Sequence, residues 1–559
     1  MYSRRARPVL SIVLALGALV LEPAVEAAVL TGTVDANGKP VAGAIVSAVA
    51  ANGASESAYT DARGRFTLAT GLGGEVDLRV RKRYFRDDVR KLDAAAAQAP
   101  LAVHLVALTD AKEISEDHPS LSYFSRISFD ADEKALFSRP NFTRDCLSCH
   151  SLGNRFTRGP RPPEGWVPTI TRMHGYLANA DKAAIQHRAE LLAQAFDGSL
   201  VSSHSEVPYD PLIAKAKIYE WKLPGTVVPH DAEYSAAQDK VYIAEMFAGE
   251  VVEVNLKDGA LQHFRLPDDG MPAGGEFTKR GLPAPYGLTI SRAPHSLAEG
   301  TDGKFYLTDS IGAAVTSFDP KSHAFENFAV GSQSLYPHTV HTGKDGVVWF
   351  TIAFSNQVGR FDPKTKDMKV VNLPATPSLS TPGTTIPYGI DISPKDGSVW
   401  YSKLASDKIG RIDPQTLEVK EYDSPVRAPR RHRFDAQGRL WVAGFSDGAI
   451  ARIDVAKWDA KIYKLPVFAK GEIPAPYALS VNPKTQEVWV NDTMLDLVWR
   501  FLPKEERFIA YPLPMKGTYT RDVTYTKDGW ACTANNPIPP AALEGNVPEL
   551  ICIDPLAAR

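Results

Sequence analysis

A Cys-x-x-Cys-His motif occupies positions 146–150 and is the strongest sign of chemistry in the sequence. Thiols at this spacing can bond covalently to the vinyl groups of a porphyrin, and the adjacent histidine can bind its iron. A redox dithiol, a zinc half-site and a chance match are the alternatives. A redox dithiol would be expected in a βαβ context, which the sequence lacks here. A zinc site would need a second pair of ligands, and none is nearby. The motif therefore predicts one covalent c-type haem, attached to Cys146 and Cys149, with His150 as an axial ligand.

Met173 is the predicted second axial ligand. It follows Trp166 and an arginine, an arrangement that resembles class I cytochrome c domains, in which such a methionine binds the iron. A thioether ligand raises the reduction potential and suits electron transfer. The alternatives are His174 as the ligand and a methionine that only fills the core. Arg158 and Arg172 are candidate partners of the haem propionates or, more simply, solvated side chains.

Residues 212–555 contain an internal repeat whose unit begins with a proline followed by a histidine, tyrosine or arginine. An aromatic β run follows, and several units close with an Asp-Pro turn. Seven units of four strands predict a mainly β fold with a seven-bladed β-propeller; two stacked sandwiches are the alternative. The predicted first-strand starts are Pro229-His230, Pro285-Tyr286, Pro337-His338, Pro387-Tyr388, Pro429-Arg430, Pro476-Tyr477 and a degenerate Tyr519-Thr520-Arg521.

The two ends of the repeat region predict how the propeller closes. Residues 218–224 have the pattern of a fourth strand but precede the first unit, whereas the last unit ends with its third strand, near Pro555. The N-terminal strand is therefore expected to complete the last blade, which leaves no open sheet edge. Cys532 and Cys552 fall on the predicted second and third strands of that blade. A cross-strand disulfide is feasible there in an oxidising compartment, and two buried thiols are the alternative.

This propeller resembles the streptogramin lyase family, typified by virginiamycin B lyase. The resemblance rests on the first-strand dipeptides and on the runs at residues 348–351, 356–363 and 408–414. It spans most of residues 212–555, although gluconolactonase-like and other propellers share the repeat. In the family, Mg²⁺ and an acid/base histidine are supported by His and Glu side chains of neighbouring blades. The resemblance implies that such a site would lie in the central funnel.

The residues that should face this funnel follow from the repeat. The first strands contribute His230, Tyr286, His338, Tyr388, Arg430, Tyr477 and roughly Thr520. The second strands contribute Glu245, Asp309, Ile352, Lys403, Gly444, Asp492 and Thr533. Within this ring His230, Glu245 and His338 are the candidate catalytic residues, and a divalent metal could bind among them. Structural, hydrogen-bonded histidines are an equally good interpretation of His230 and His338.

The ligand set of the lyases carries over only in part. His338 is kept, but Ile352 stands where its glutamate belongs. His230 keeps Glu245, but Val228 replaces the other carboxylate. With the strand starts given above, no two adjacent blades both present a histidine. Streptogramin-type elimination is therefore not expected.

Two smaller segments are predicted before the propeller. Residues 28–109 have the pattern of a β-sandwich, and the spacing of their glycines with Asp61 and Phe66 resembles the carboxypeptidase regulatory-like domain. Such a module implies a structural or adhesive role, because it carries no chemistry of its own. Residues 110–205 show helical spacing of apolar residues, as at Ile185, Leu192 and Phe196, and contain the haem motif. They are interpreted as a cytochrome c-like segment.

The N-terminus and the composition predict where the protein works. Residues 1–27 combine three arginines, a short apolar run and small residues before position 28, which is typical of a cleaved secretory signal peptide; a retained anchor helix is the alternative. The formal net charge of −2 gives no support for nucleic-acid binding. No later stretch of sequence is apolar enough to span a membrane. The mature chain, with its propeller at residues 212–559, is expected in the periplasm.

These observations leave three hypotheses for function. The first is an exported c-type haem protein in electron transfer or oxidation. It would exchange electrons with a soluble or membrane partner and bind an unknown small molecule or a redox partner in its propeller. The second is a C–O lyase or hydrolase of the streptogramin lyase or gluconolactonase type with an accessory cytochrome. The third is a non-catalytic binding scaffold. The sequence favours the first, does not identify a substrate, and leaves open whether the protein is an enzyme.

Overall fold

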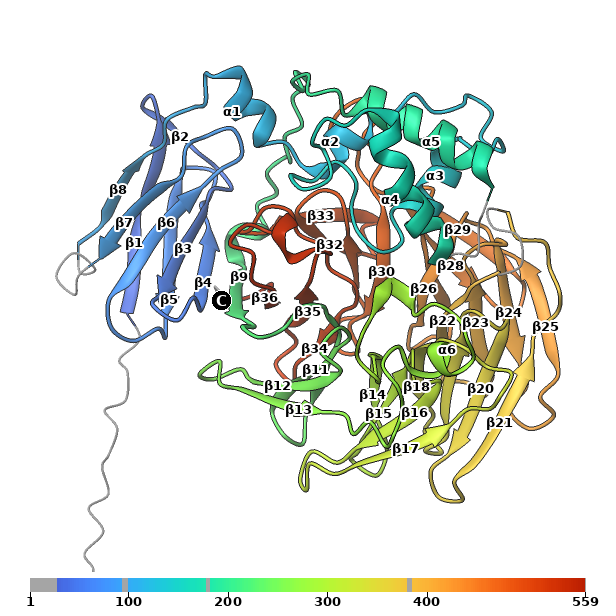
Figure 1. Ribbon diagram of the computed structural model, residues 1–559. Coiled ribbons are helices and arrows are strands. Elements are labelled where there is room, and N and C mark those ends of the chain that lie inside the picture. The colour runs from blue at the N-terminus through green and yellow to red at the C-terminus, as the bar shows by residue number, and fades with distance from the viewer. Residues whose placement is uncertain (1–27, 93–98, 177–180, 380–384, 558–559) are drawn as a thin grey trace, which may run out of the picture.

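The computed structural model describes residues 28–92, 99–176, 181–379 and 385–557 (Figure 1). The predicted signal peptide, residues 1–27, lies outside these ranges. Within them the chain is mainly β, with seven four-stranded sheets and one eight-stranded sheet. Among the helices of the described ranges, none is long and apolar enough to cross a membrane.

The N-terminal β domain is a sandwich of two sheets. One has the order β2-β1-β5 with β8 parallel to β1, and the other contains β4-β3-β6-β7. Leu30, Val46, Phe66 and Leu78 are buried between the sheets, as expected where each strand has one apolar face. The strands are β1 (Ala28–Ala36), β2 (Lys39–Pro40), β3 (Ile45–Ala50), β4 (Ser55–Tyr59), β5 (Arg65–Thr70), β6 (Val76–Arg81), β7 (Asp88–Leu92) and β8 (Leu101–His104).

Six blades of the propeller are separate antiparallel sheets in which four consecutive strands pair in order. The first strands of neighbouring blades lie side by side around the centre. Large apolar side chains such as Trp349, Trp400 and Trp441 are buried in the clusters between blades. The four-stranded repeat predicted from the sequence is confirmed.

The first three blades have these strands: β10 (Pro229–Ser235), β11 (Lys240–Glu245), β12 (Glu250–Asn255) and β13 (Leu261–Arg265); β14 (Pro294–Glu299), β15 (Phe305–Asp309), β16 (Ala314–Phe318) and β17 (Phe325–Ala329); β18 (Pro337–Thr342), β19 (Val348–Ile352), β20 (Gln357–Asp362) and β21 (Asp367–Asn372). The next three have these: β22 (Pro387–Ile392), β23 (Val399–Lys403), β24 (Lys408–Ile412) and β25 (Val419–Asp423); β26 (Pro429–Phe434), β27 (Leu440–Gly444), β28 (Ala449–Asp454) and β29 (Asp459–Lys464); β30 (Pro476–Val481), β31 (Val488–Asp492), β32 (Leu497–Leu502) and β33 (Arg507–Pro512).

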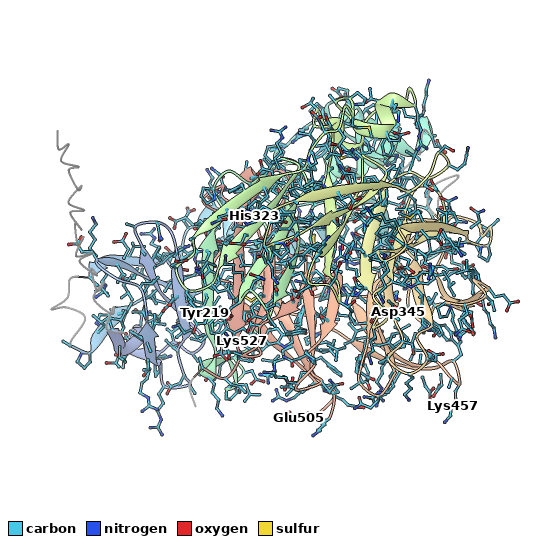
Figure 2. All side chains as sticks on the ribbon, turned by 90° about the horizontal axis from the view of Figure 1, so that it is seen from below. Tyr219, His323, Asp345, Lys457, Glu505 and Lys527 are labelled. Carbon is cyan, nitrogen blue, oxygen red and sulfur yellow. A yellow bond between two sulfur atoms is a disulfide. The ribbon has the colours of Figure 1, made fainter. Side chains whose placement is uncertain are left out.

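The seventh blade closes the propeller as predicted. Its strands β34 (Thr524–Tyr525), β35 (Ala531–Asn535) and β36 (Glu549–Asp554) are completed by β9 (Lys217–Lys222), which pairs antiparallel with β36. The other edge of β9 pairs with β4, so one eight-stranded sheet runs through both domains. Figure 2 places Tyr219 of β9 at this junction. The N-terminal domain thus covers the edge that the closing strand would otherwise expose.

Cys532 and Cys552 occupy directly opposed positions of β35 and β36 and form a disulfide. The cross-strand pairing considered from the sequence is therefore present. Because β36 also pairs with the closing strand β9, the disulfide lies in the blade that joins the two ends of the propeller.

The described part of residues 110–205 forms five helices. In Figure 1 the first lies beside the N-terminal domain, and the other four cover the upper end of the propeller. Asp110 and Asp181 each accept two backbone N–H groups and so begin the first and last of them. Phe142 and Trp166 share one apolar core with propeller side chains such as Tyr388 and Tyr477, so the helices are packed onto the propeller. The helices are α1 (Ala111–Glu116), α2 (Ser120–Phe124), α3 (Arg139–Cys146), α4 (Pro163–Tyr176) and α5 (Lys182–Ala195).

Each first strand of the first six blades contains one extra residue after its leading proline. Such a bulge re-aims a side chain, here near the propeller centre. In the second blade the strand begins at Pro294, so the predicted start at Pro285 is wrong. Residues 285–287 form a short helical turn in a loop that also contains α6 (Gly275–Lys279). The prediction failed because this long loop carries a second Pro-aromatic dipeptide.

Candidate functional site

The Cys-x-x-Cys-His loop and the propeller funnel line one cavity of about 610 Å³. The helical segment contributes Cys146, Cys149 and His150. The propeller contributes first-strand side chains, among them His230, His295, His338, Tyr388 and Tyr477. Sequence reasoning treats the haem motif and the funnel as separate sites. In the structure a molecule bound in the funnel would lie next to the motif.

Propeller side chains hold three consecutive backbone carbonyls of the motif, those of residues 147–149. The Tyr519 hydroxyl donates to the first at 2.7 Å, Arg430 to the second at 2.7 Å, and Arg521 to the third at 2.9 Å. All three donors are buried. Hydrogen bonds from charged donors contribute about 1.5–3 kcal/mol each. The propeller therefore fixes the position of the motif.

The two ring nitrogens of His150 have different surroundings. Its Nδ1 lies 3.0 Å from the carbonyl oxygen of Ser151, which places the proton on Nδ1. Nε2 has no hydrogen-bond partner among the described residues. Burial lowers the pKa of His150 and so favours the neutral imidazole.

The Cys146 thiol is buried and protonated. Burial raises its pKa to about 12, whereas reactive and metal-binding cysteines are thiolates with lowered pKa values. Cys146 and Cys149 are not disulfide-bonded. Two free thiols next to His150 are compatible with covalent haem attachment.

One face of α4 forms another wall of the cavity. Trp166, Ile170 and Met173 recur at helical spacing, and all three line it. His174 also lines the cavity, but its Nε2 lies 2.6 Å from a guanidinium nitrogen of Arg188. Because a guanidinium only donates, this contact uses the Nε2 lone pair. The geometry therefore favours Met173 over His174 as the second ligand.

The two predicted propionate partners lie in different places. Arg172 is exposed and lines the cavity. Arg158 lines a different pocket and stacks on the Tyr123 ring, with its guanidinium carbon 4.4 Å from the ring centroid. Arg521, which sequence reasoning did not consider for this role, also lines the cavity and has no carboxylate partner among the described residues.

A funnel histidine was missed from the sequence. His295 of β14 lies between His230 and His338, with ring centroids 3.8 Å and 4.0 Å away. The inference that no two adjacent blades present a histidine is therefore wrong, because three consecutive blades do. The sequence signal for His295 was the distance along the chain between the first-strand proline and the end of the second strand. Pro294 pairs with Asp309 at the end of its second strand, just as the other first-strand prolines do in their blades.

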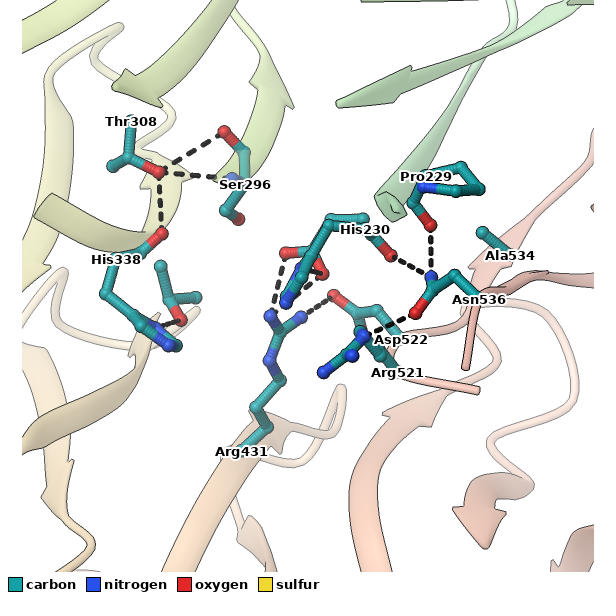
Figure 3. Close-up of polar contacts among 12 residues, drawn as sticks. Pro229, His230, Ser296, Thr308, His338, Arg431, Arg521, Asp522, Ala534 and Asn536 are labelled. Carbon is teal, nitrogen blue, oxygen red and sulfur yellow. Dashed lines mark hydrogen bonds and ion pairs between the residues drawn. The ribbon is translucent and has the colours of Figure 1, made fainter. Parts of the chain in front are cut away.

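The three imidazoles are neutral in the folded protein. Burial, together with the charge of Arg521, lowers the pKa of His230 to about 3. Burial also holds the pKa values of His295 and His338 well below their ordinary value. His338 Nδ1 lies 2.8 Å from the Thr339 hydroxyl oxygen (Figure 3). The funnel wall therefore offers uncharged nitrogen atoms.

Ion pairs cross the funnel at the positions that directly follow His230 and Arg430 in their first strands. Arg431 of β26 reaches Asp231 of β10 at 2.8 Å and Asp522 at 2.6 Å (Figure 3). Burial alone would raise the pKa of Asp231, but Arg431 and His230 outweigh it and hold that pKa well below its usual value. These ion pairs link blades on opposite sides of the funnel.

The predicted second-strand residues do not line the cavity. The Glu245 carboxylate instead accepts three backbone N–H groups of adjacent loops, the one from Val227 at 2.9 Å. Asp309 and Asp492 also accept loop N–H groups, and Lys403 pairs with Glu421. In the last blade Asn535, rather than Thr533, pairs with Thr520. The geometry thus gives Glu245 a structural role, which corrects its selection as a catalytic candidate.

Tyr286 reaches the cavity from the inserted loop, although it was expected on a first strand. Its hydroxyl lies 3.5 Å from Cys149 Sγ and 3.4 Å from the Tyr336 hydroxyl. Its backbone has a φ of 58°, which lies in the left-handed region. The loop between the first two blades therefore contributes directly to the wall beside the motif.

Comparison with known proteins places these features in a family context. Residues 271–493 match the Virginiamycin B lyase family, and residues 29–107 match the carboxypeptidase regulatory-like domain. The propeller is of the virginiamycin B lyase type. No curated protein matches the sequence.

Solved structures show likeness to this virginiamycin B lyase-type propeller in fold alone. A catalytically inactive virginiamycin B lyase from Staphylococcus aureus with quinupristin is 17% identical, covers 60% of this chain and 99% of that chain, and has a TM-score of 0.47. A streptogramin B lyase is 17% identical with coverages of 61% and 98% and a TM-score of 0.47. YCF48 bound to D1 peptide is 10% identical with coverages of 63% and 97% and a TM-score of 0.42.

The propeller does not keep the Mg²⁺ site that the resemblance to the lyases implies. Mg²⁺ prefers oxygen ligands in octahedral geometry. Here the cavity wall carries imidazoles, the Glu245 carboxylate is taken up by backbone N–H groups, and Ile352 is fully buried. The residues present therefore do not fit Mg²⁺.

Proposed function

We propose that this protein is an exported, periplasmic c-type haem protein that transfers electrons to or from a small molecule held in its propeller funnel. The observation that carries the proposal is the shared cavity of about 610 Å³, lined by the Cys-x-x-Cys-His loop and by the first-strand residues. A cytochrome that was only accessory to a lyase would not need to share a wall with the funnel.

The haem, when bound, would supply one-electron redox chemistry. Cys146 and Cys149 would attach it, and His150 Nε2 and Met173 Sδ would be the iron ligands. Arg430 and Arg521 place two buried positive charges beside the motif, and neither has a carboxylate partner in the described part of the chain. These charges favour a reduced centre and anionic ligands.

A hydrogen-bonded tyrosine pair could move a proton at the funnel wall. The Tyr388 and Tyr477 hydroxyl oxygens lie 2.7 Å apart, and both rings line the cavity. Burial would raise the pKa of Tyr477, but the charges of Arg430 and Arg521 outweigh it and lower that pKa. Burial raises the pKa of Tyr388. Tyr477 is thus the more acidic of the two hydroxyls and is suited to donate a proton toward Tyr388.

Electrons would enter or leave through the exposed rim of the cavity. Phe156 lines the cavity and is 51% exposed, and Arg172 is an exposed cation at the same cavity. We propose this rim as the approach of a soluble or membrane electron-transfer partner. An apolar contact with neighbouring positive charge suits a partner with an acidic surface.

An anaerobic screen tests the proposed function. Candidate small molecules are added to the oxidised holoprotein, and reduction is followed in the haem absorption spectrum. A substrate should reduce the wild type at least tenfold faster than Tyr388→Phe, whereas Tyr422→Phe, on the outer strand β25, should match the wild type. Cleavage of a streptogramin B lactone that is lost in His338→Ala would contradict the proposal and support the lyase alternative. Ligand binding with neither haem reduction nor lactone cleavage would support the hypothesis of a non-catalytic binding scaffold.

A further inference from the structure

Three neighbouring imidazoles present nitrogen atoms to the cavity without protein partners. His230, His295 and His338 are 3%, 3% and 4% exposed, and all line the cavity. In the described residues, Nε2 of each makes no hydrogen bond, and His295 Nδ1 is also without a partner. Buried polar atoms are normally satisfied. A ligand that accepts lone pairs would satisfy the unprotonated nitrogen of each ring.

We propose that the funnel binds one first-row transition-metal ion, Zn²⁺ or Cu²⁺, through the imidazoles of His230 and His295. One ligand atom from each of His230, Asp231 and His295 lies within 4.8 Å of the other two. Zn–N bonds of about 2.0–2.1 Å place two ligand atoms at most about 4 Å apart, so the two rings would have to turn toward a bound ion.

Asp231 positions His230 for this role. The His230 Nδ1 donates to Asp231 Oδ1 at 2.9 Å, which leaves the lone pair on Nε2. Metal-bound histidines commonly donate their other N–H to a carboxylate in this way. Arg431 donates to both Asp231 oxygens, at 2.9 and 2.8 Å (Figure 3). The carboxylate is thereby neutralised and acts through His230 rather than as a ligand.

The donor atoms select the class of ion. Imidazole suits zinc and copper, whereas Mg²⁺ and Ca²⁺ need oxygen ligands. This site therefore differs from the one that the lyase family implies in both ligand type and metal.

The surrounding charges indicate what else the ion would hold. Arg521 lines the same cavity, and its positive charge disfavours a dication with only neutral ligands. A hydroxide or a carboxylate in a remaining coordination position would offset this repulsion. The His338 ring is tilted by 44° to the His295 ring, with 4.0 Å between their centroids, and its Nε2 makes no hydrogen bond within the described residues. The ion would thus be an open site for an anionic ligand beside the haem motif.

Metal binding by the full-length exported protein tests this inference. The protein is freed of metal with a chelator, titrated with ZnCl₂ or CuCl₂ by calorimetry, and analysed for metal after dialysis. We expect one ion per chain in the wild type and at least a 100-fold weaker affinity in His230→Ala and His295→Ala. Asp231→Asn should weaken binding about 10–100-fold. His263→Ala is the matched control, because His263 pairs with Glu250 on an outer strand and should leave affinity unchanged.

Three results would overturn the inference. One is the lack of stoichiometric zinc or copper in the wild type. Another is a loss of metal affinity in His263→Ala as large as that in His230→Ala or His295→Ala. The third is a changed haem spectrum with unchanged metal content in His295→Ala, which would make the histidine an iron ligand. His295→Gln repeats the test if His295→Ala fails to fold. The Cys146→Ala/Cys149→Ala protein should still bind the ion. Failure of the haem proposal can therefore be distinguished from failure of the metal-site inference.

Discussion

Arg521 Nη2 donates to the backbone carbonyl of Cys149 at 2.9 Å. The same guanidinium donates to the Tyr477 hydroxyl at 3.2 Å and is buried. A single side chain of the last blade therefore contacts both the cysteine motif and the funnel wall. A change in charge at the cysteine motif should therefore alter the electrostatic potential at the funnel wall, and the reverse should also hold.

Replacing Arg521 should lower the reduction potential of the haem. The Arg521→Gln variant removes a buried positive charge next to the motif, and a nearby positive charge favours the reduced form. We expect the midpoint potential to fall by on the order of tens of millivolts, with covalent haem retained. Spectroelectrochemical titration measures this shift. Arg411→Gln, at a surface pair with Asp396, is the control and should leave the potential unchanged. An unchanged potential in Arg521→Gln would contradict the electrostatic coupling.

Met173→Ala should remove the weak thioether charge-transfer band of the oxidised protein. The potential should fall by on the order of tenths of a volt, since axial ligand identity spans about 0.8 V among haem proteins. Met368→Ala, on an outer strand, is the matched control. His174→Ala should keep the band because the contact of His174 with Arg188 uses its Nε2. Loss of the band in His174→Ala alone would make His174 the ligand.

Asp492 should make stability depend on pH. Burial raises the pKa of Asp492 to about 7 from 3.8. As the pH rises from about 4 to 7, the unfolded chain loses this proton while the folded chain keeps it, so stability falls and is then constant above pH 7. Asp492→Asn should flatten this fall, which amounts to a few kcal/mol at most. Urea unfolding at pH 4.5 and 7.5 measures it, and an identical pH dependence in both proteins would refute the assignment.

The disulfide between Cys532 and Cys552 should stabilise the propeller without affecting the haem. It closes a loop with a sequence separation of 20, for which the chain-entropy treatment gives about 3 kcal/mol. We expect Cys532→Ala/Cys552→Ala to lower the free energy of unfolding by about that amount in denaturant titrations. An unchanged unfolding midpoint would show that β9 pairing alone closes the last blade.

Much of the fold could be predicted because repeats and closing strands leave local signals. Trp349 and Trp400 mark second strands, and the strand at β9 matches the missing fourth strand of the last blade. The second blade was misplaced because Pro285-Tyr286 is locally indistinguishable from a strand start. Only its pairing with the second strand, which places Pro294 opposite Asp309, separates the two.

The site itself was less predictable because it depends on contacts between distant segments. The sequence singles out Cys149 and His338, but nothing local shows that the loop and the funnel share a cavity. Glu245 looked like a funnel residue by position alone. Its carboxylate turns to backbone N–H groups because loop amides at the end of the strand need acceptors. Such competition for hydrogen bonds is decided by tertiary structure.

The most direct test of the central claim is the covalent haem content of the purified protein. Haem is extracted under acid conditions, and what stays bound to the denatured chain is measured from its alkaline pyridine spectrum. The account predicts one covalent haem per wild-type chain and none in Cys146→Ala/Cys149→Ala, with Cys532→Ala/Cys552→Ala unchanged. A wild-type chain without covalent haem, or a Cys146→Ala/Cys149→Ala chain that retains it, would contradict the account.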